Sequence, residues 1–190
     1  MSTRSRRVML RYSAPRGHRI LLAASLACAV GSAAAVPAVA VPDTADERDY
    51  PTMMIVMDAS GSMDEPSGSG GTRMEAAGEA FGQVVDAMPA EAQVGLRVFG
   101  GGTSGVDACE DSRLAVPVGP VDAPALAEAM AELEPSGDTP LAYSMEHAAG
   151  DLPAEGQRII VVISDGEETC GGQACEVAGR LVEDGIDVRI

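Results

Sequence analysis

The chain of 190 residues contains no lysine, and this absence excludes several kinds of catalytic site. A nucleotide-binding P-loop needs a lysine to contact the phosphates, and a serine–lysine dyad needs one as its base. The sequence also lacks a Gly-x-Ser-x-Gly elbow, the turn that presents the nucleophilic serine of many hydrolases. Beyond residue 40 the chain has one histidine, His147, within an expected helix. We therefore expect no enzyme; the alternative is a hydrolase with Ser60 or Ser164 as nucleophile, or with water activated by a metal.

Acidic residues are missing from the first 40 positions, which carry six arginines and an apolar run that extends over residues 20–41. A basic segment, an apolar segment and a small-residue stretch such as Ala38-Val39-Ala40 are typical of a signal peptide. We expect residues 1–40 to be this signal, residues 41–50 to be a linker and residues 51–190 to form one domain. An uncleaved N-terminal membrane anchor is the alternative. We therefore expect a secreted or cell-surface protein.

Positive charge is scarce in the expected mature chain. Removal of residues 1–40 takes away six of the 13 basic residues and none of the 29 acidic ones, which leaves a net charge of −22. Nucleic acid is not an expected partner, because its phosphates repel such a surface. The acidic surface instead attracts divalent cations. Contact with a membrane is expected only through an uncleaved N-terminal segment.

Only three cysteines lie beyond the expected signal: Cys109, Cys170 and Cys175. In an exported chain, cysteines are candidates for disulfide bonds. A bond between Cys170 and Cys175 would close a short loop, whereas a bond from Cys109 would tie the long loop after the second strand to the same rim. Sequence alone does not choose among the possible pairings, and each of them leaves one thiol unpaired.

Apolar strands alternate with amphipathic helices along the expected domain, which predicts an α/β fold with a doubly wound, mostly parallel sheet and helices on both faces. Pro117 places the third strand at a sheet edge, because proline cannot donate a ladder hydrogen bond. Thr139 is expected to cap a helix that Pro140 opens, and Asp122 to cap the helix before it. Strands are expected at residues 52–57, 94–99, 114–118, 159–163 and 187–190, and the first and last helices at residues 73–88 and 174–183.

Oxygen-bearing side chains stand at the ends of these elements. Asp58, Ser60 and Ser62 follow the first strand. Thr139 precedes a helix, and Asp165 follows the fourth strand. In doubly wound sheets, ligands bind beyond the carboxyl ends of the strands. Hydroxyl and carboxylate oxygens without sulfur or imidazole favour Mg²⁺, Mn²⁺ or Ca²⁺, so we predict a divalent cation site built from these five residues.

The Asp-x-Ser-x-Ser run, the later threonine and the Asp-Gly after an apolar strand together resemble the von Willebrand factor A domain with its metal-ion-dependent adhesion site. The resemblance covers residues 50–190. It implies that Ser60, Ser62 and Thr139 bind the cation directly, and that Asp58 and Asp165 act mostly through water. It also implies a further strand and further helices after residue 190, so we expect a domain that is incomplete at its C-terminal end.

The resemblance implies an adhesion or interaction module whose Mg²⁺, Mn²⁺ or Ca²⁺ binds an Asp or Glu carboxylate of a protein partner. Neutral hydroxyl ligands suit this role, because they leave the ion electron-poor and strengthen its attraction for an incoming carboxylate. The alternative is a metal-stabilised structural domain of a larger surface or transport assembly. Capture of an acidic partner would distinguish the two hypotheses.

Overall fold

The computed structural model describes residues 50–68, 70–103 and 105–190. The predicted signal peptide, the alternative membrane anchor and all but the last residue of the predicted linker lie outside these residues. Within residues 50–190, apart from 69 and 104, no helix combines the length and the apolar character needed to cross a membrane. The elements follow in the order β1 (Thr52–Asp58), η1 (Gly61–Asp64), α1 (Arg73–Ala87), β2 (Gln93–Phe99), η2 (Ala108–Glu110), β3 (Ser112–Pro120), α2 (Ala123–Ala131), α3 (Leu141–Asp151), β4 (Arg158–Ile163), α4 (Ala174–Glu183) and β5 (Ile186–Arg189).

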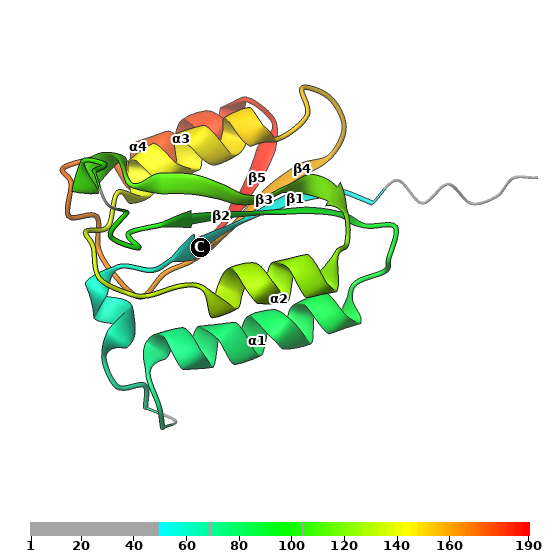
Figure 1. Ribbon diagram of the computed structural model, residues 1–190. Helices are drawn as coiled ribbons and strands as arrows, with labels where there is room; N and C mark the ends of the chain where they lie inside the picture. The colour runs from blue at the N-terminus through cyan, green and yellow to red at the C-terminus, as the bar shows by residue number, and fades with distance from the viewer. Residues whose placement is uncertain (1–49, 69, 104) are drawn as a thin grey trace, which may run out of the picture. The chain divides into compact units, whose positions relative to one another are not determined.

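The strands form one sheet in the order β3-β2-β1-β4-β5. β1 pairs in parallel with β2 and β4, and β4 pairs in parallel with β5. β3 runs antiparallel to β2 at the edge of the sheet, where the sequence predicts the strand that contains Pro117. α1 and α2 cover one face of the sheet, and α3 and α4 cover the other (Figure 1). The predicted α/β class and the doubly wound, mostly parallel sheet are confirmed.

β1 is apolar from Met53 to Met57 because the sheet is covered on both faces. Met54 and Val56 belong to the core beneath α3 and α4, whereas Ile55 and Met57 belong to the core beneath α1 and α2. Successive side chains of a strand point to opposite faces, so each neighbour along β1 enters a different core. This double burial fixes β1 in the middle of the sheet and sets the position of the loop that follows it.

One ion pair crosses from the sheet to α3. Arg97 lies on β2 and is 6% exposed. Its Nε donates to Asp151 Oδ2 at 2.7 Å, and its second nitrogen, Nη1, donates to Ser112 Oγ at 3.2 Å. The pair joins β2 to the last residue of α3. The buried guanidinium of Arg97 therefore has a charged partner and a hydroxyl partner within the protein.

Helix α3 begins one residue later than the sequence predicts. Pro140 is its N-cap with φ −80° and ψ 60°, and it makes no side-chain cap, so the prediction that Thr139 caps this helix is wrong. The carboxylate of Glu168, from the loop after β4, accepts a hydrogen bond from Ala142 N at 2.8 Å instead. A distant side chain therefore satisfies this helix end, and the Thr139 hydroxyl is available for another role.

Candidate metal centre

The carboxyl ends of β1 and β4 meet at the left-hand end of the sheet in Figure 1. Because Met57 pairs with Ile163, the next residues of the two strands lie side by side, and Ser164 Oγ donates to Asp58 Oδ2 at 2.5 Å. The other oxygen of Asp58 accepts from Ser60 N at 2.7 Å. Asp58 is 0% exposed, and no arginine or histidine in the described part of the chain pairs with it. Its buried carboxylate thus meets only neutral donors.

The loop after β1 places two serine hydroxyls together. It folds into the short helix η1, whose Met63 is 2% exposed and anchors the loop in the interior. Ser60 Oγ and Ser62 Oγ are 3.1 Å apart, and Ser62 Oγ donates to Asp165 Oδ1 at 2.9 Å. The two serine hydroxyls and the Asp165 carboxylate therefore form one chain of hydrogen-bonded oxygens at this end of the sheet.

Thr139 reaches the same place on the loop between α2 and α3. Ser60 and Gly137 form an isolated parallel bridge, which aligns this loop with the loop after β1. A Cβ atom added to Gly166 would lie 3.5 Å from Ser62 Oγ and 3.7 Å from Thr139 Oγ1. The two hydroxyls therefore both border Gly166, although the Thr139 side chain makes no hydrogen bond to the other four predicted residues in the described part. The fold brings all five predicted residues to one end of the sheet.

A glycine beneath the site permits the close approach of these loops. Gly100 has a φ of +73°, and an added Cβ atom would lie 2.5 Å from Asp138 O and 2.9 Å from Ser60 N. Both the backbone angle and the space require glycine, since these neighbours are backbone atoms that cannot rotate away. The carbonyl of Gly100 also accepts from Gly137 N at 2.8 Å. The end of β2 thus supports the two loops that carry Ser60 and Thr139.

Sequence reasoning missed Arg73, which lies at the rim of the site. This first residue of α1 forms an ion pair with Asp165 Oδ2, and its Nη1 also donates to Ser62 O at 3.3 Å. Its Nη2 lies 3.0 Å from Glu65 Oε2. An arginine in the first turn of a helix opposes the helix dipole. An arginine that is unfavourable for its own helix is the feature of the sequence that could have indicated a role for Arg73 outside α1.

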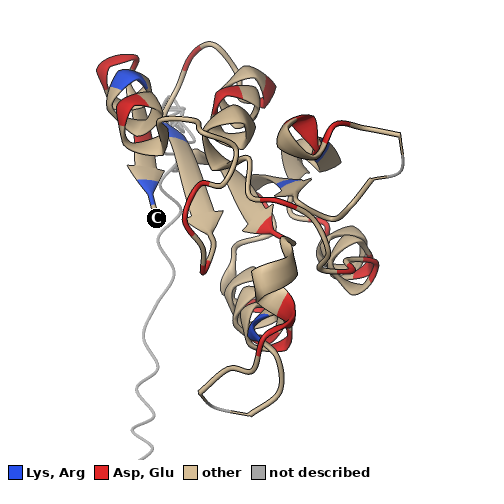
Figure 2. Ribbon diagram, turned by 90° about the vertical axis from the view of Figure 1, so that its left-hand side faces the viewer, with Lys and Arg blue, Asp and Glu red and all other residues tan. Residues whose placement is uncertain are grey.

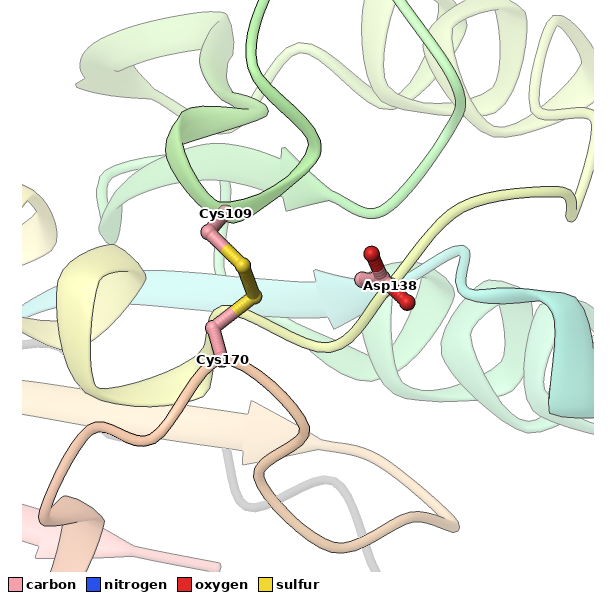
Figure 3. A group of neighbouring side chains, drawn as sticks. All are labelled: Cys109, Asp138 and Cys170. Carbon is pink, nitrogen blue, oxygen red and sulfur yellow. A yellow bond between two sulfur atoms is a disulfide. The ribbon is translucent and has the colours of Figure 1, made fainter.

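The disulfide question left open by the sequence is decided by the fold. Cys109 is bonded to Cys170, and Cys175 is exposed with an unpaired thiol. Figure 3 shows Asp138 beside the two sulfur atoms. This trio has metal-ligand spacing, with its ligand atoms within 4.8 Å of one another. However, sulfurs bonded to each other are not thiolates and do not bind a metal. The bond instead ties η2 to the loop between Asp165 and α4.

Acidic groups dominate the surroundings of the site. Figure 2 looks onto this end of the sheet. Most of the helices and loops in view carry Asp or Glu (red), and few carry a basic residue (blue). Three neutral hydroxyls and two carboxylates form a donor set of oxygen alone, which fits Mg²⁺, Mn²⁺ or Ca²⁺. The buried Asp58 carboxylate also favours a cation, because isolated charges are costly to bury. The residues present therefore fit a hard divalent cation.

Known proteins with similar sequences or structures support the assignment of the fold. YwmC of Bacillus subtilis (strain 168) is 28% identical over 163 residues, which span 81% of this chain and 71% of that protein. The manganese-loaded TRAP protein of Plasmodium vivax has a TM-score of 0.57 at 15% identity, and the similarity covers 74% of this chain and 56% of that one. Proximal thread matrix protein 1 from the mussel byssus, with zinc in its MIDAS motif, has a TM-score of 0.54 at 15% identity over 73% of this chain and 37% of that one.

This chain therefore spans about a third to a half of the length of such solved structures. The family model described as the von Willebrand factor type A domain matches residues 53–168, more than half of the chain. The matched range begins in β1 and extends into the loop after β4, so it contains all five predicted site residues. The chain belongs to the von Willebrand factor type A domain family.

Proposed function

We propose that this domain binds a divalent cation, with Mg²⁺ as its resident ion, and that the bound cation recruits an acidic side chain of a protein partner. Ser60, Ser62 and Thr139 would hold the ion, with Asp58 and Asp165 behind them. The observation that carries the proposal is Asp58, a fully buried carboxylate that accepts hydrogen bonds from the neutral donors Ser60 N and Ser164 Oγ. Such a charge is stabilised by a cation placed on the open side of the hydroxyls.

Each of these residues has a separate task in the proposed site. Asp58 orients the loop by accepting hydrogen bonds from Ser60 N and from Ser164 Oγ, 106 residues away along the chain. Asp165 holds the Ser62 hydroxyl in position. When bound, the cation supplies a positive charge that attracts a carboxylate oxygen. Because the hydroxyl ligands are neutral, they reduce that charge less than carboxylate ligands would.

The metals of two structural neighbours support this proposal. The Plasmodium protein is manganese-loaded, and the mussel protein has zinc in its MIDAS motif. The oxygen-only donor set of this chain favours Mg²⁺ or Mn²⁺ over zinc, because zinc sites in proteins usually contain sulfur or imidazole ligands. We therefore propose that zinc is not the resident ion of this domain.

We also propose that the site binds a ligand and does not catalyse a reaction. A serine nucleophile needs a neighbouring base, most often an imidazole. The imidazole of His147 is exposed on α3, where its Nδ1 lies 2.9 Å from Tyr143 O and its ring lies against the Tyr143 ring at a tilt of 33°. Ser164 Oγ donates to Asp58 and so supports the loop. Ester hydrolysis by the purified protein that Ser164→Ala abolishes would overturn this proposal.

We propose that the protein is exported. The disulfide between Cys109 and Cys170 is stable in an oxidising compartment and is rare in the cytosol. The N-terminal segment of the sequence has the layout of a signal peptide. Detection of the full protein only in the cytosolic fraction of its host would contradict this.

Mn²⁺ or Mg²⁺ is expected to raise the melting temperature of the full chain relative to chelator. A ligand at 100 times its dissociation constant adds about 2.7 kcal/mol to the free energy of unfolding, which corresponds to a rise of roughly 5–10 °C. Asp58→Ala and Ser60→Ala are expected to lose this rise, because each removes part of the site. Ser136→Ala is the matched control, since within the described residues its exposed hydroxyl donates to Glu134 O, two residues earlier in the same loop. Thermal denaturation followed by circular dichroism measures the effect.

The same variants separate the two binding hypotheses. A protein from the cell surface should be retained on the immobilised chain in Mg²⁺, and should be lost both in chelator and with Ser60→Ala. Substitution of one Asp or Glu in that partner should abolish retention. Stabilisation by cation without any such partner would favour a metal-stabilised structural domain, and a melting temperature indifferent to cation would contradict the metal site itself.

A further inference from the structure

Arg73 is the only positively charged side chain at the candidate site among the residues that the structure describes. Its guanidinium pairs with Asp165, donates to the Ser62 carbonyl at 3.3 Å and lies 3.0 Å from Glu65. Two of these partners, Ser62 and Asp165, are among the five residues of the predicted cation site. The arginine therefore bears directly on the geometry and the charge of the proposed metal site, although no sequence motif includes it.

The two oxygens of Asp165 are divided between different partners. Oδ1 accepts from the Ser62 hydroxyl at 2.9 Å, and Oδ2 is paired with Arg73. The Asp165 side chain is 17% exposed, whereas Arg73 is 37% exposed and faces solvent at the rim. A carboxylate whose second oxygen is paired with a guanidinium has less negative charge to offer to an ion. Arg73 thus limits how far Asp165 can neutralise a bound cation.

Glu65 fixes the arginine in this position. The loop between η1 and α1 folds back on itself, since Arg73 N donates to Glu65 O at 2.9 Å and Pro66 forms an antiparallel bridge with Thr72. Thr72 and Glu75 form a capping box at the start of α1. The backbone that carries Arg73 is therefore fixed at both sides, and the guanidinium is held between Glu65 and Asp165.

We propose that Arg73 is a positioning residue that weakens cation binding in order to keep the bound ion electrophilic. This inference rests on the proposed function. The arginine repels the ion and withholds one Asp165 oxygen from it, so the ion keeps more of its charge for the carboxylate of a partner. Neutralising Arg73 relieves the repulsion, frees the Asp165 carboxylate and tightens metal binding. A purely structural arginine would have the opposite effect or none, because its loss would loosen the site.

The test is the dissociation constant of Mn²⁺ for the full chain, measured by electron paramagnetic resonance of the unbound ion. Arg73→Gln is expected to bind Mn²⁺ roughly tenfold more tightly than the wild type, because one like charge close to a divalent ion is removed. Arg73→Lys keeps the positive charge, on which the repulsion depends, and is expected to stay within about twofold of the wild type. Higher salt should reduce the difference in Mn²⁺ dissociation constant between Arg73→Gln and the wild type, since ions screen exposed charges.

Arg180→Gln is the matched control, because it removes the same charge from an exposed pair with Glu146 on a different helix. If Arg73→Gln binds Mn²⁺ no more tightly than Arg180→Gln does, Arg73 does not act on the ion and the inference is wrong. Thermal melts in chelator show whether each variant is folded. If Arg73→Gln is misfolded, the Mn²⁺ affinity of Arg73→Met is compared with that of Arg180→Gln instead. Absence of Mn²⁺ binding by the wild type would instead overturn the proposed function.

Discussion

Asp151→Ala is expected to lower the free energy of unfolding by about 3–5 kcal/mol, because it leaves the buried guanidinium of Arg97 without its charged partner. The side chains of Arg97 and Asp151 are 8% and 16% exposed, so water replaces the lost contact poorly. An acidic residue at a helix C-terminus opposes the helix dipole, and its removal should return only about 0.3–1 kcal/mol. The loss of the ion pair therefore dominates. Chemical denaturation measures the change.

Glu146→Ala is the control for this prediction, because Glu146 also forms an ion pair on α3 but an exposed one, with Arg180. Its loss is expected to cost no more than about 1 kcal/mol. The double variant Arg97→Met with Asp151→Leu should recover most of the stability, since apolar residues of similar size can replace a buried pair. A cost for Asp151→Ala equal to that of Glu146→Ala would show that Arg97 finds another partner.

Removal of the disulfide by Cys109→Ser together with Cys170→Ser is expected to cost about 4 kcal/mol, the chain-entropy value for a loop of this size. The two cysteines are 61 residues apart in sequence, and the loop they close includes α2, α3 and β4. The melting temperature should fall by roughly 10–15 °C. Replacing both cysteines prevents a new bond between Cys170 and Cys175, which are close in sequence.

Cys175→Ser provides the matched control, because the Cys175 thiol is exposed and unpaired. Its stability should stay within about 0.5 kcal/mol of the wild type. A reducing agent should lower the melting temperature of the wild type and of Cys175→Ser, and leave that of the double variant unchanged. Equal stability of the double variant and the wild type would contradict the bond. Because Cys170 follows Asp165 in the same loop, we also expect the double variant to bind cation more weakly.

The sequence predicted the sheet well because its signals are local. Continuous apolar runs predicted β1 and β4, and their bounds agree with the structure to within one residue. Pro117 predicted the edge position of β3, since the absence of one N–H group is a property of the residue alone. β3 nevertheless extends over Ser112–Pro120, longer than predicted, because pairing with β2 overrides the weak strand preference of its ends.

The candidate site was also largely visible in the sequence. Parallel strands bring their carboxyl ends to one edge of the sheet, so polar residues at or just after the ends of β1 and β4 had to lie together. Asp58 and Asp165 follow this rule, and Ser60 and Ser62 follow from their place in the short loop after β1. The cap of α3 did not follow, because Glu168 reaches Ala142 from a different loop.

By itself, the sequence determined the fold class, the order of strands and helices and the oxygen-rich composition of the candidate site, since each depends on residue type and on spacing along the chain. Only the tertiary structure decided the pairing of Cys109 with Cys170, the burial of Asp58 and the contact of Arg73 with Asp165, which are 92 residues apart in sequence. These features depend on how closely distant segments approach one another. That approach is set by packing on both faces of the sheet, which no local pattern records.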